Sequence, residues 1–280
     1  MEKLSGTAGL WGKKMAEIQV HPRVIELTEK VSFLKNELSS KIEEYDQLIN
    51  HTIPNLEAEY QLKIGFKGYE KFSLECAIRR MRRKIQLIQA LINNNKPVTL
   101  ENIEKQLDEE FQEWKKQMDA LFQQLLEAQI RIEAESLSKE ESKELKDIYK
   151  RLVFLLHPDV NPNVTEKEKQ LWFQVLEAYK NADLATLRTL AMIIEGDQPA
   201  EITQKSSIEY LEDRCAVLKG KIVAIINKIQ TRNNSFPCDI AAKLQDEVWV
   251  SLQVHQMDEE IQKLSIEKEA LESILAEFCV

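Results

Sequence analysis

The feature that most constrains the fold is a set of apolar rows that repeat at alternating steps of three and four residues. In the clearest row, no step is missed between Ile208 and Ile229. This spacing places the apolar side chains on one face of a helix and is typical of a coiled-coil seam. Less regular rows occur in four further segments, 27–48, 74–92, 100–132 and 250–278. The predicted architecture is therefore a set of long helices that pack side by side.

Glycine and proline are scarce, with 7 of each in 280 residues. Average chains hold roughly 7 % glycine and 5 % proline, so few residues remain here for the turns of a many-stranded sheet. An all-α fold is therefore predicted. The 47 acidic residues outnumber the 38 basic ones, which gives a formal net charge of −9. This acidity disfavours a nucleic-acid partner.

The first part of the chain, 22–135, is predicted to form an antiparallel helical arm. One turn is expected at 50–55, because the residue before Pro54 avoids the helical region. A second turn is expected at 93–97, and Thr99 is expected to cap the long helix that follows it. Short turns of this kind make consecutive helices antiparallel neighbours.

The last part of the chain, 199–280, repeats this style. A turn at 233–237 is expected to join two seams into a second helical hairpin, separate from the first. The uninterrupted row before this turn favours self-association, and either arm is a candidate surface for a client or partner protein. Residues 1–21 are expected to form a mobile N-terminus.

The one strongly basic run is 79–84. If the chain folds back near Asn95, Arg82 and Arg83 face the acidic residues 108–110. Ion pairs that flank a seam are ordinary in coiled coils, so we favour this structural interpretation. The alternative is a nucleic-acid patch, which would show as salt-dependent retention on DNA or RNA.

Several classes of site have no signature in the sequence. There is no glycine-rich phosphate loop and no nucleophile motif, so no catalytic residue and no enzyme activity are predicted. The histidines outside 136–198 are isolated and no C-x-x-C pair occurs, so no metal site or cofactor is predicted. A signal peptide and a membrane-spanning apolar stretch are also missing, which favours a cytoplasmic protein without membrane contact. The cysteines are then expected to be reduced thiols: Cys76, Cys215, Cys238 and Cys279.

A segment of different character lies between the two arms, at 136–198. Capping boxes at 138–141 and 165–168 each predict the start of a helix. The first helix is expected to stop at the tripeptide 157–159, which opens a polar loop. Two antiparallel helices with a polar loop presented at their tip are therefore predicted.

This segment resembles a J-domain. Tyr149 stands at the family's spacing before the family's signature tripeptide, and Glu177-Ala178-Tyr179 matches its third-helix signature. Trp172 and Val175 stand where the family has phenylalanine and isoleucine. The tripeptide itself is His157, Pro158 and Asp159. The resemblance implies a small helical domain with a core of six residues: Tyr149, Leu152, Trp172, Val175, Ala178 and Tyr179.

The segment departs from the family in two respects. The family's first helix, with its Tyr-x-x-Leu-Gly motif, is missing, and the end of the preceding arm at 125–134 is expected to take its place. Leu155 and Val160 stand where the family commonly has basic residues, so the positive face is smaller than usual.

The resemblance implies a co-chaperone that stimulates ATP hydrolysis by a DnaK-type chaperone. The side chain of Asp159, expected to be unpaired in the free protein, would pair with an arginine of that partner. Pro158 would stiffen the loop, and a basic strip would face an acidic groove. The residues implied to bind the chaperone are His157, Pro158, Asp159, Lys146, Lys150 and Arg151. The alternative is a coiled-coil adaptor with a degenerate J-like hairpin that engages no chaperone.

Overall fold

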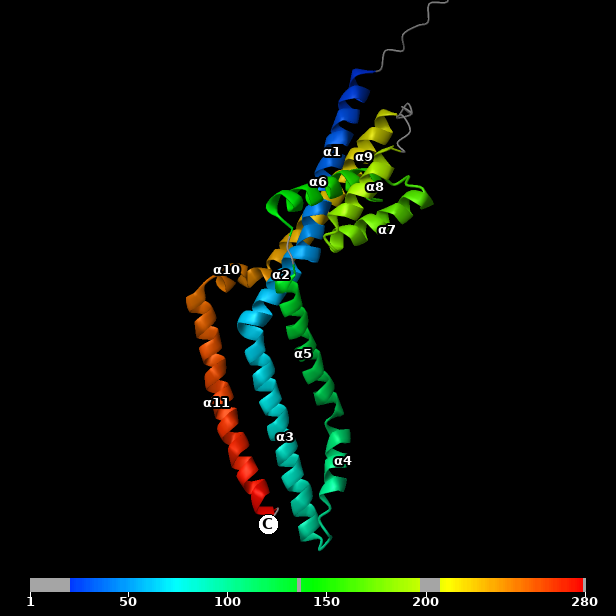
Figure 1. The fold of residues 1–280 in the computed structure, drawn as a ribbon. Helices are drawn as coiled ribbons and strands as arrows, with labels where there is room; N and C mark the ends of the chain where they lie inside the picture. Colours follow the sequence, from blue (N-terminus) through cyan, green and yellow to red (C-terminus); the bar gives the residue numbers. More distant parts are fainter. Residues whose placement is uncertain (1–20, 135–136, 197–206, 279–280) are drawn as a thin grey trace, which may run out of the picture.

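The computed structural model describes residues 21–134, 137–196 and 207–278. Every regular element in these three ranges is a helix and none is a strand, so the predicted all-α fold is confirmed. The predicted mobile segment 1–21 lies outside the described ranges except for its last residue. The described part is elongated, with helices arranged along two halves of one central helical segment (Figure 1).

The central segment, which we call the spine, is helical from residue 22 to residue 93 without a break. At 1.5 Å per residue, this corresponds to a length of roughly 100 Å. Two short π-helical turns, η1 and η2, lie inside it. Its elements are α1 (Pro22–Gln47), η1 (Leu48–Thr52), α2 (Ile53–Tyr60), η2 (Gln61–Gly65) and α3 (Phe66–Asn93).

The turn predicted at 50–55 is wrong, because Pro54 does not end the helix. A proline lacks the N–H that would bond the carbonyl four residues earlier, which here belongs to Asn50. The Arg131 guanidinium donates a hydrogen bond to that carbonyl at 3.2 Å and another to Asn55 Oδ1 at 2.7 Å. The carbonyl that Pro54 leaves unsatisfied therefore has a partner, and the π-helical turn absorbs the change in geometry.

The predicted second hairpin is also wrong. α9 (Ile208–Asn233) and α11 (Glu247–Phe278) do not pack on each other; α9 packs along α1 and α11 along α3. The two C-terminal helices therefore lie on different halves of the spine (Figure 1). Their seams exist as predicted, but a seam specifies only that an apolar partner is needed, and the spine supplies it.

The connection between α9 and α11 is docked on the middle of the spine. It contains η3 (Cys238–Ile240) and α10 (Ala241–Leu244). Lys63 Nζ in η2 donates to the carbonyl of Leu244 at 2.7 Å, and the rings of Tyr60 and Phe236 meet edge to face at 5.0 Å. These contacts fix the point at which the chain passes from one half of the spine to the other.

The turn predicted after the spine is present, and it returns the chain along α3 as α4 (Leu100–Glu110) and α5 (Gln112–Glu133). The single long helix expected here is divided at Phe111, whose φ of −102° and ψ of 11° are not helical. Thr99 is the N-cap residue, but its side chain makes no capping hydrogen bond. α5 packs on α2, η2 and α3.

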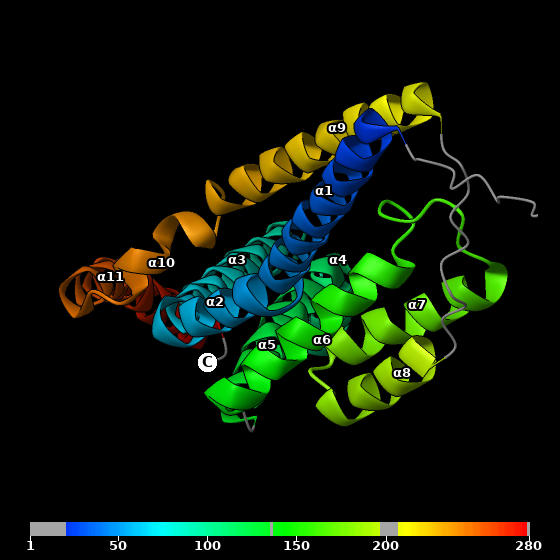
Figure 2. The same ribbon diagram turned by 90° about the horizontal axis from the view of Figure 1, so that it is seen from above.

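The segment between the arms forms α6 (Lys139–Leu156), α7 (Glu166–Lys180) and α8 (Leu184–Gly196). Both predicted capping boxes are formed, at 138–141 and 165–168. α6 packs on α1, and α7 and α8 cover α6, while α9 lies against α1 as well (Figure 2). The helix that covers the α6–α7 hairpin is therefore α1 and not the expected segment 125–134, which packs on the spine.

The basic run 79–84 is used in ion pairs between helices, as the structural interpretation predicted. Arg83 makes a two-pronged pair with Glu110, at 2.8 and 2.9 Å. Arg82 pairs with Glu267 of α11 rather than with residues 108–110, because α11 lies on that side of α3. The Arg83 guanidinium lowers the pKa of Glu110 to about 2.

The ion pair between Arg83 and Glu110 generates a prediction. Arg83→Glu places two like charges at this contact, so the melting temperature at neutral pH should fall. Because the pKa of Glu110 is lowered in the folded protein, the pair contributes stability above the ordinary glutamate pKa, and this contribution is lost as the pH falls toward about 2. The matched control is the charge swap Arg83→Glu with Glu110→Arg, which should restore the melting temperature. A single variant as stable as the wild type would contradict the structural role.

Candidate functional site

The candidate site is the loop between α6 and α7, which begins where His157 caps the end of α6. The loop is folded back on itself by its own hydrogen bonds. The backbone N–H of Asp159 donates to His157 Nδ1 at 3.0 Å, and the N–H of Asn161 donates to the His157 carbonyl at 2.8 Å. Asn161 Nδ2 also donates to the carbonyls of Phe154 and Leu155, at 2.6 and 2.7 Å. The last carbonyls of α6 are therefore satisfied by the loop that follows it.

His157 is half-buried and acts as an acceptor inside the loop. Its ring meets the Trp172 ring edge to face, with centroids 5.1 Å apart. Burial lowers the pKa of His157, although the nearby Asp159 carboxylate acts in the opposite direction. The neutral imidazole accepts from the Asp159 N–H at Nδ1, which assigns its proton to Nε2.

Asp159 is not unpaired, which corrects the prediction from the sequence. Its Oδ1 lies 2.8 Å from Lys221 Nζ of α9, and the same Nζ donates to the Asp159 carbonyl at 3.2 Å. Burial alone would raise the pKa of Asp159, but the bond and charge of Lys221 hold it below its usual value. The next carbonyl, of Val160, accepts from the Arg214 guanidinium at 2.6 Å. The sequence pattern does not predict these contacts, because the apolar row of α9 does not specify that α1 is its partner helix.

Lys221 and Arg214 are the site residues that sequence reasoning missed. They stand seven residues apart, so two helical turns bring both to the same side of α9. Leu218, halfway between them, is fully buried in the core that also contains Val160. The signal in the sequence was a pair of basic residues beside the seam, but nothing in that pattern identifies the loop that they contact.

The predicted basic strip lies on α6, beside the loop, and it is partly neutralised within the chain. Arg151 Nε lies 3.1 Å from Glu195 Oε1 of α8. Lys146 and Lys150 lie near Glu43 of α1, close enough for their charges to oppose the rise that burial causes in its pKa. Lys150 and Arg151 are exposed, and Lys146 is half-buried. The strip is therefore exposed to solvent, but Glu195 and Glu43 neutralise part of its positive charge.

The six residues expected to form the core of the hairpin are all buried, in one cluster that also includes side chains of α1, α8 and α9. The rings of Tyr149 and Tyr179 stack with centroids 3.7 Å apart. Their hydroxyls reach α1, where Tyr149 donates to Asp46 Oδ2 at 2.7 Å and Tyr179 to Gln47 Oε1 at 2.9 Å. These buried hydrogen bonds fix the hairpin in one position on the spine.

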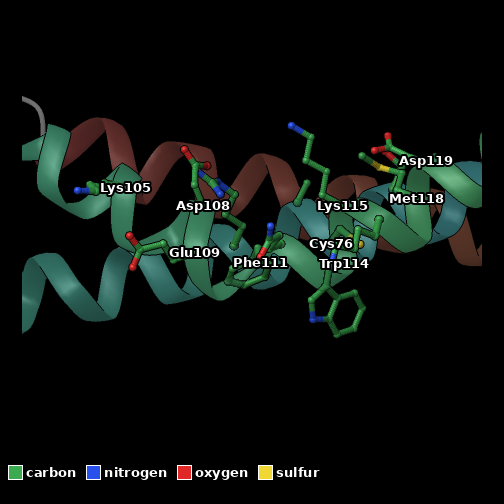
Figure 3. Close-up of a pocket in the computed structure, with 14 residues that line it drawn as sticks. Cys76, Lys105, Asp108, Glu109, Phe111, Trp114, Lys115, Met118 and Asp119 are labelled. Carbon is green, nitrogen blue, oxygen red and sulfur yellow. The ribbon is translucent and has the colours of Figure 1, made fainter.

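A groove in the surface lies along α3, away from the α6–α7 loop, and contains none of the predicted site residues. It is a groove of about 800 Å³ between α3 and α4–α5, with Cys76, Trp114 and Met118 among the residues that line it (Figure 3). Lysine and acidic side chains alternate around it, so it presents no single charge. Burial raises the pKa of the Cys76 thiol, which disfavours the reactive thiolate. Nothing in the groove points to a reaction.

Two further features, a metal site and a membrane-spanning helix, are not found within the described ranges. No group of three or more His, Cys, Asp or Glu side chains there is arranged to hold a metal ion. None of the helices described combines the length and the apolar character needed to cross a membrane.

The bond between Tyr149 and Asp46 generates a prediction about pH. Tyr149→Phe removes the donor from a half-buried carboxylate and should cost about 1 to 2 kcal/mol of stability at pH 7. Burial raises the pKa of Asp46, so its protonated form is favoured in the folded protein and stability falls as the pH rises through that pKa. The loss in Tyr149→Phe should therefore be smaller at about pH 4 than at pH 7, as measured by urea unfolding.

The matched control for this prediction is the double variant Asp46→Asn, Tyr149→Phe, in which no charge is left without a donor. Its loss of stability relative to Asp46→Asn should be the same at both pH values. An equal loss at both pH values in the single variant would show that the Asp46 charge is not the reason for the cost.

Comparisons with known proteins do not assign the chain to a family. No family model, no curated protein and no solved structure gives a significant match. The resemblance of the α6–α7 hairpin to a J-domain therefore depends on the residues and the geometry described above, and the function that it implies is put forward as a proposal.

Proposed function

We propose that this chain is a J-domain co-chaperone, which docks on a DnaK-type chaperone and stimulates its ATP hydrolysis. The observation that supports this most directly is the loop geometry. His157 closes the end of α6 and accepts from the Asp159 N–H, while Pro158 is exposed and half of the Asp159 side-chain surface is open to solvent. The signature tripeptide is thus held in one conformation with its proline and its carboxylate at the surface.

In this proposal, the chain itself performs no chemistry on ATP. The Asp159 carboxylate would form a charge-assisted pair with an arginine of the chaperone. Lys150 and Arg151, exposed on α6, would attract an acidic groove and orient the encounter. They border a shallow hollow between α1, α6 and α8, which offers room for a partner's side chains. A cytoplasmic location belongs to the same proposal.

The lower half of the spine would hold the client or a second copy of the chain. There α3 lies between α11 on one side and α4 and α5 on the other (Figure 1). Large apolar side chains remain exposed on the outer helices, including Ile130 at 67 % and Ile266 at 62 %. In this proposal, exposed apolar side chains of this kind would supply contacts to the client or to the second copy.

The second candidate is a coiled-coil adaptor in which the hairpin only supports the fold. One observation favours it, namely that the loop is already bonded to α9 through Lys221 and Arg214. The intact tripeptide His157-Pro158-Asp159, with its proline and its carboxylate at the surface, leads us to place the co-chaperone first.

The carboxylate of Asp159 generates the main functional prediction. Asp159→Asn should abolish stimulation of the chaperone, because a charge-assisted pair needs the negative charge. The variant should remain folded, since a half-exposed ion pair contributes at most about 1 kcal/mol. The measurement is single-turnover ATP hydrolysis by the DnaK-type chaperone of the same organism. Asp213→Asn, at an exposed position of α9, is the matched control and should stimulate like the wild type.

A second prediction concerns the basic strip. Lys150→Ala should raise the concentration needed for half-maximal stimulation and weaken its dependence on salt, with little change in the maximal rate, because an exposed cation mainly steers association. Lys263→Ala, an exposed lysine of α11, is the control and should change neither quantity. An unchanged half-maximal concentration in Lys150→Ala would remove the strip from the docking surface.

A further inference from the structure

We infer that α9 is an internal competitor for the α6–α7 loop, so that a docking partner must displace Lys221 in order to reach Asp159. This inference rests on the proposed function, because it concerns the regulation of the same site. The chain itself therefore covers part of its docking loop, and the contacts of α9 determine how readily a partner can reach that loop.

Lys221 bonds the Asp159 carboxylate, which is the group that a docking chaperone would need to bind. Its Nζ bonds both Oδ1 and the carbonyl of Asp159, at 2.8 and 3.2 Å. The two side chains are 32 % and 50 % exposed, so solvent reaches the pair and an incoming cation can exchange with Lys221. An arginine fork binds a carboxylate through two parallel bonds, whereas the ammonium group of lysine is a point charge, so the exchange favours arginine.

The rest of the loop is held from both sides. Arg214 bonds the Val160 carbonyl from α9, and Lys35 Nζ of α1 donates to Asn161 Oδ1 at 2.8 Å. The seam between α1 and α9 keeps these helices in place, and Leu38 of α1 and Leu218 of α9 are fully buried in it. The loop therefore packs against α1 and α9. A partner must approach Asp159 from the side on which its carboxylate is exposed to solvent.

The size of the competition follows from the kind of ion pair. Half-exposed pairs of this type are weak, so the presence of Lys221 should reduce the apparent affinity for the chaperone about two- to fivefold. The maximal stimulated rate should be unaffected, because Lys221 is displaced once the partner has bound.

The test uses the full chain and single-turnover hydrolysis by the DnaK-type chaperone. Lys221→Gln removes the cation at nearly constant size, and its half-maximal concentration should fall two- to fivefold at an unchanged maximal rate. Lys219→Gln, at an exposed position two residues earlier on the same helix, is the matched control and should equal the wild type. Lys221→Arg keeps the charge and should show no gain.

The outcomes separate this inference from the function on which it rests. If wild type and Lys221→Gln stimulate with the same half-maximal concentration, the competition is overturned and the co-chaperone proposal stands. If neither of them stimulates, and the double variant Arg214→Gln, Lys221→Gln does not either, both are overturned.

A second measurement needs no chaperone. The amide N–H groups of Val160 and Asn161 bond the carbonyl of His157, and their hydrogen exchange reports how firmly the loop is held. Exchange at both positions should be faster in Lys221→Gln than in Lys219→Gln. Equal exchange in the two variants would show that Lys221 does not restrain the loop, and would overturn the inference.

Discussion

The architecture depends on one constraint, the continuity of the spine helix through Pro54. Pro54 removes the usual partner of the Asn50 carbonyl, and the π-helical turn η1 together with the Arg131 guanidinium accommodates that loss. Because the helix does not end there, α1 and α3 are parts of one spine and cannot fold back on each other. Each half of the spine must then find its apolar partner elsewhere, which is why α9 and α11 are drawn to opposite halves.

The same spine determines how the J-like hairpin is held. Tyr149 and Tyr179 reach acidic and amide side chains of α1 through buried hydrogen bonds. Such bonds contribute little net free energy, but their loss is costly, so they select one register of the hairpin on α1. Once that register is set, the loop falls beside α9, and the contact of Lys221 with Asp159 follows from it.

Much of the local structure could be predicted from the sequence, and little of the pairing between helices. The capping boxes at 138–141 and 165–168, the turn after the spine and the pair of Arg83 with Glu110 all involve residues close in sequence or related by one turn, so local chemistry specifies them. The partners of α9 and α11 do not follow from periodicity, since any apolar row satisfies a seam. The Lys221 contact with Asp159 was missed for the same reason.

The pairing of distant segments also affects how the chain is made. Arg23 of α1 pairs with Glu212, and Lys71 of α3 with Glu260, each across 189 residues of sequence. During synthesis at about 5 to 20 residues per second, each half of the spine waits roughly 10 to 40 s before its partner helix is translated. Throughout that time the surfaces of α1 and α3 that α9 and α11 cover in the folded protein remain exposed, so the nascent chain presents apolar side chains to the solvent. Helix pairings of such large sequence separation should make folding slower than that of a bundle whose helices pack on their neighbours in sequence.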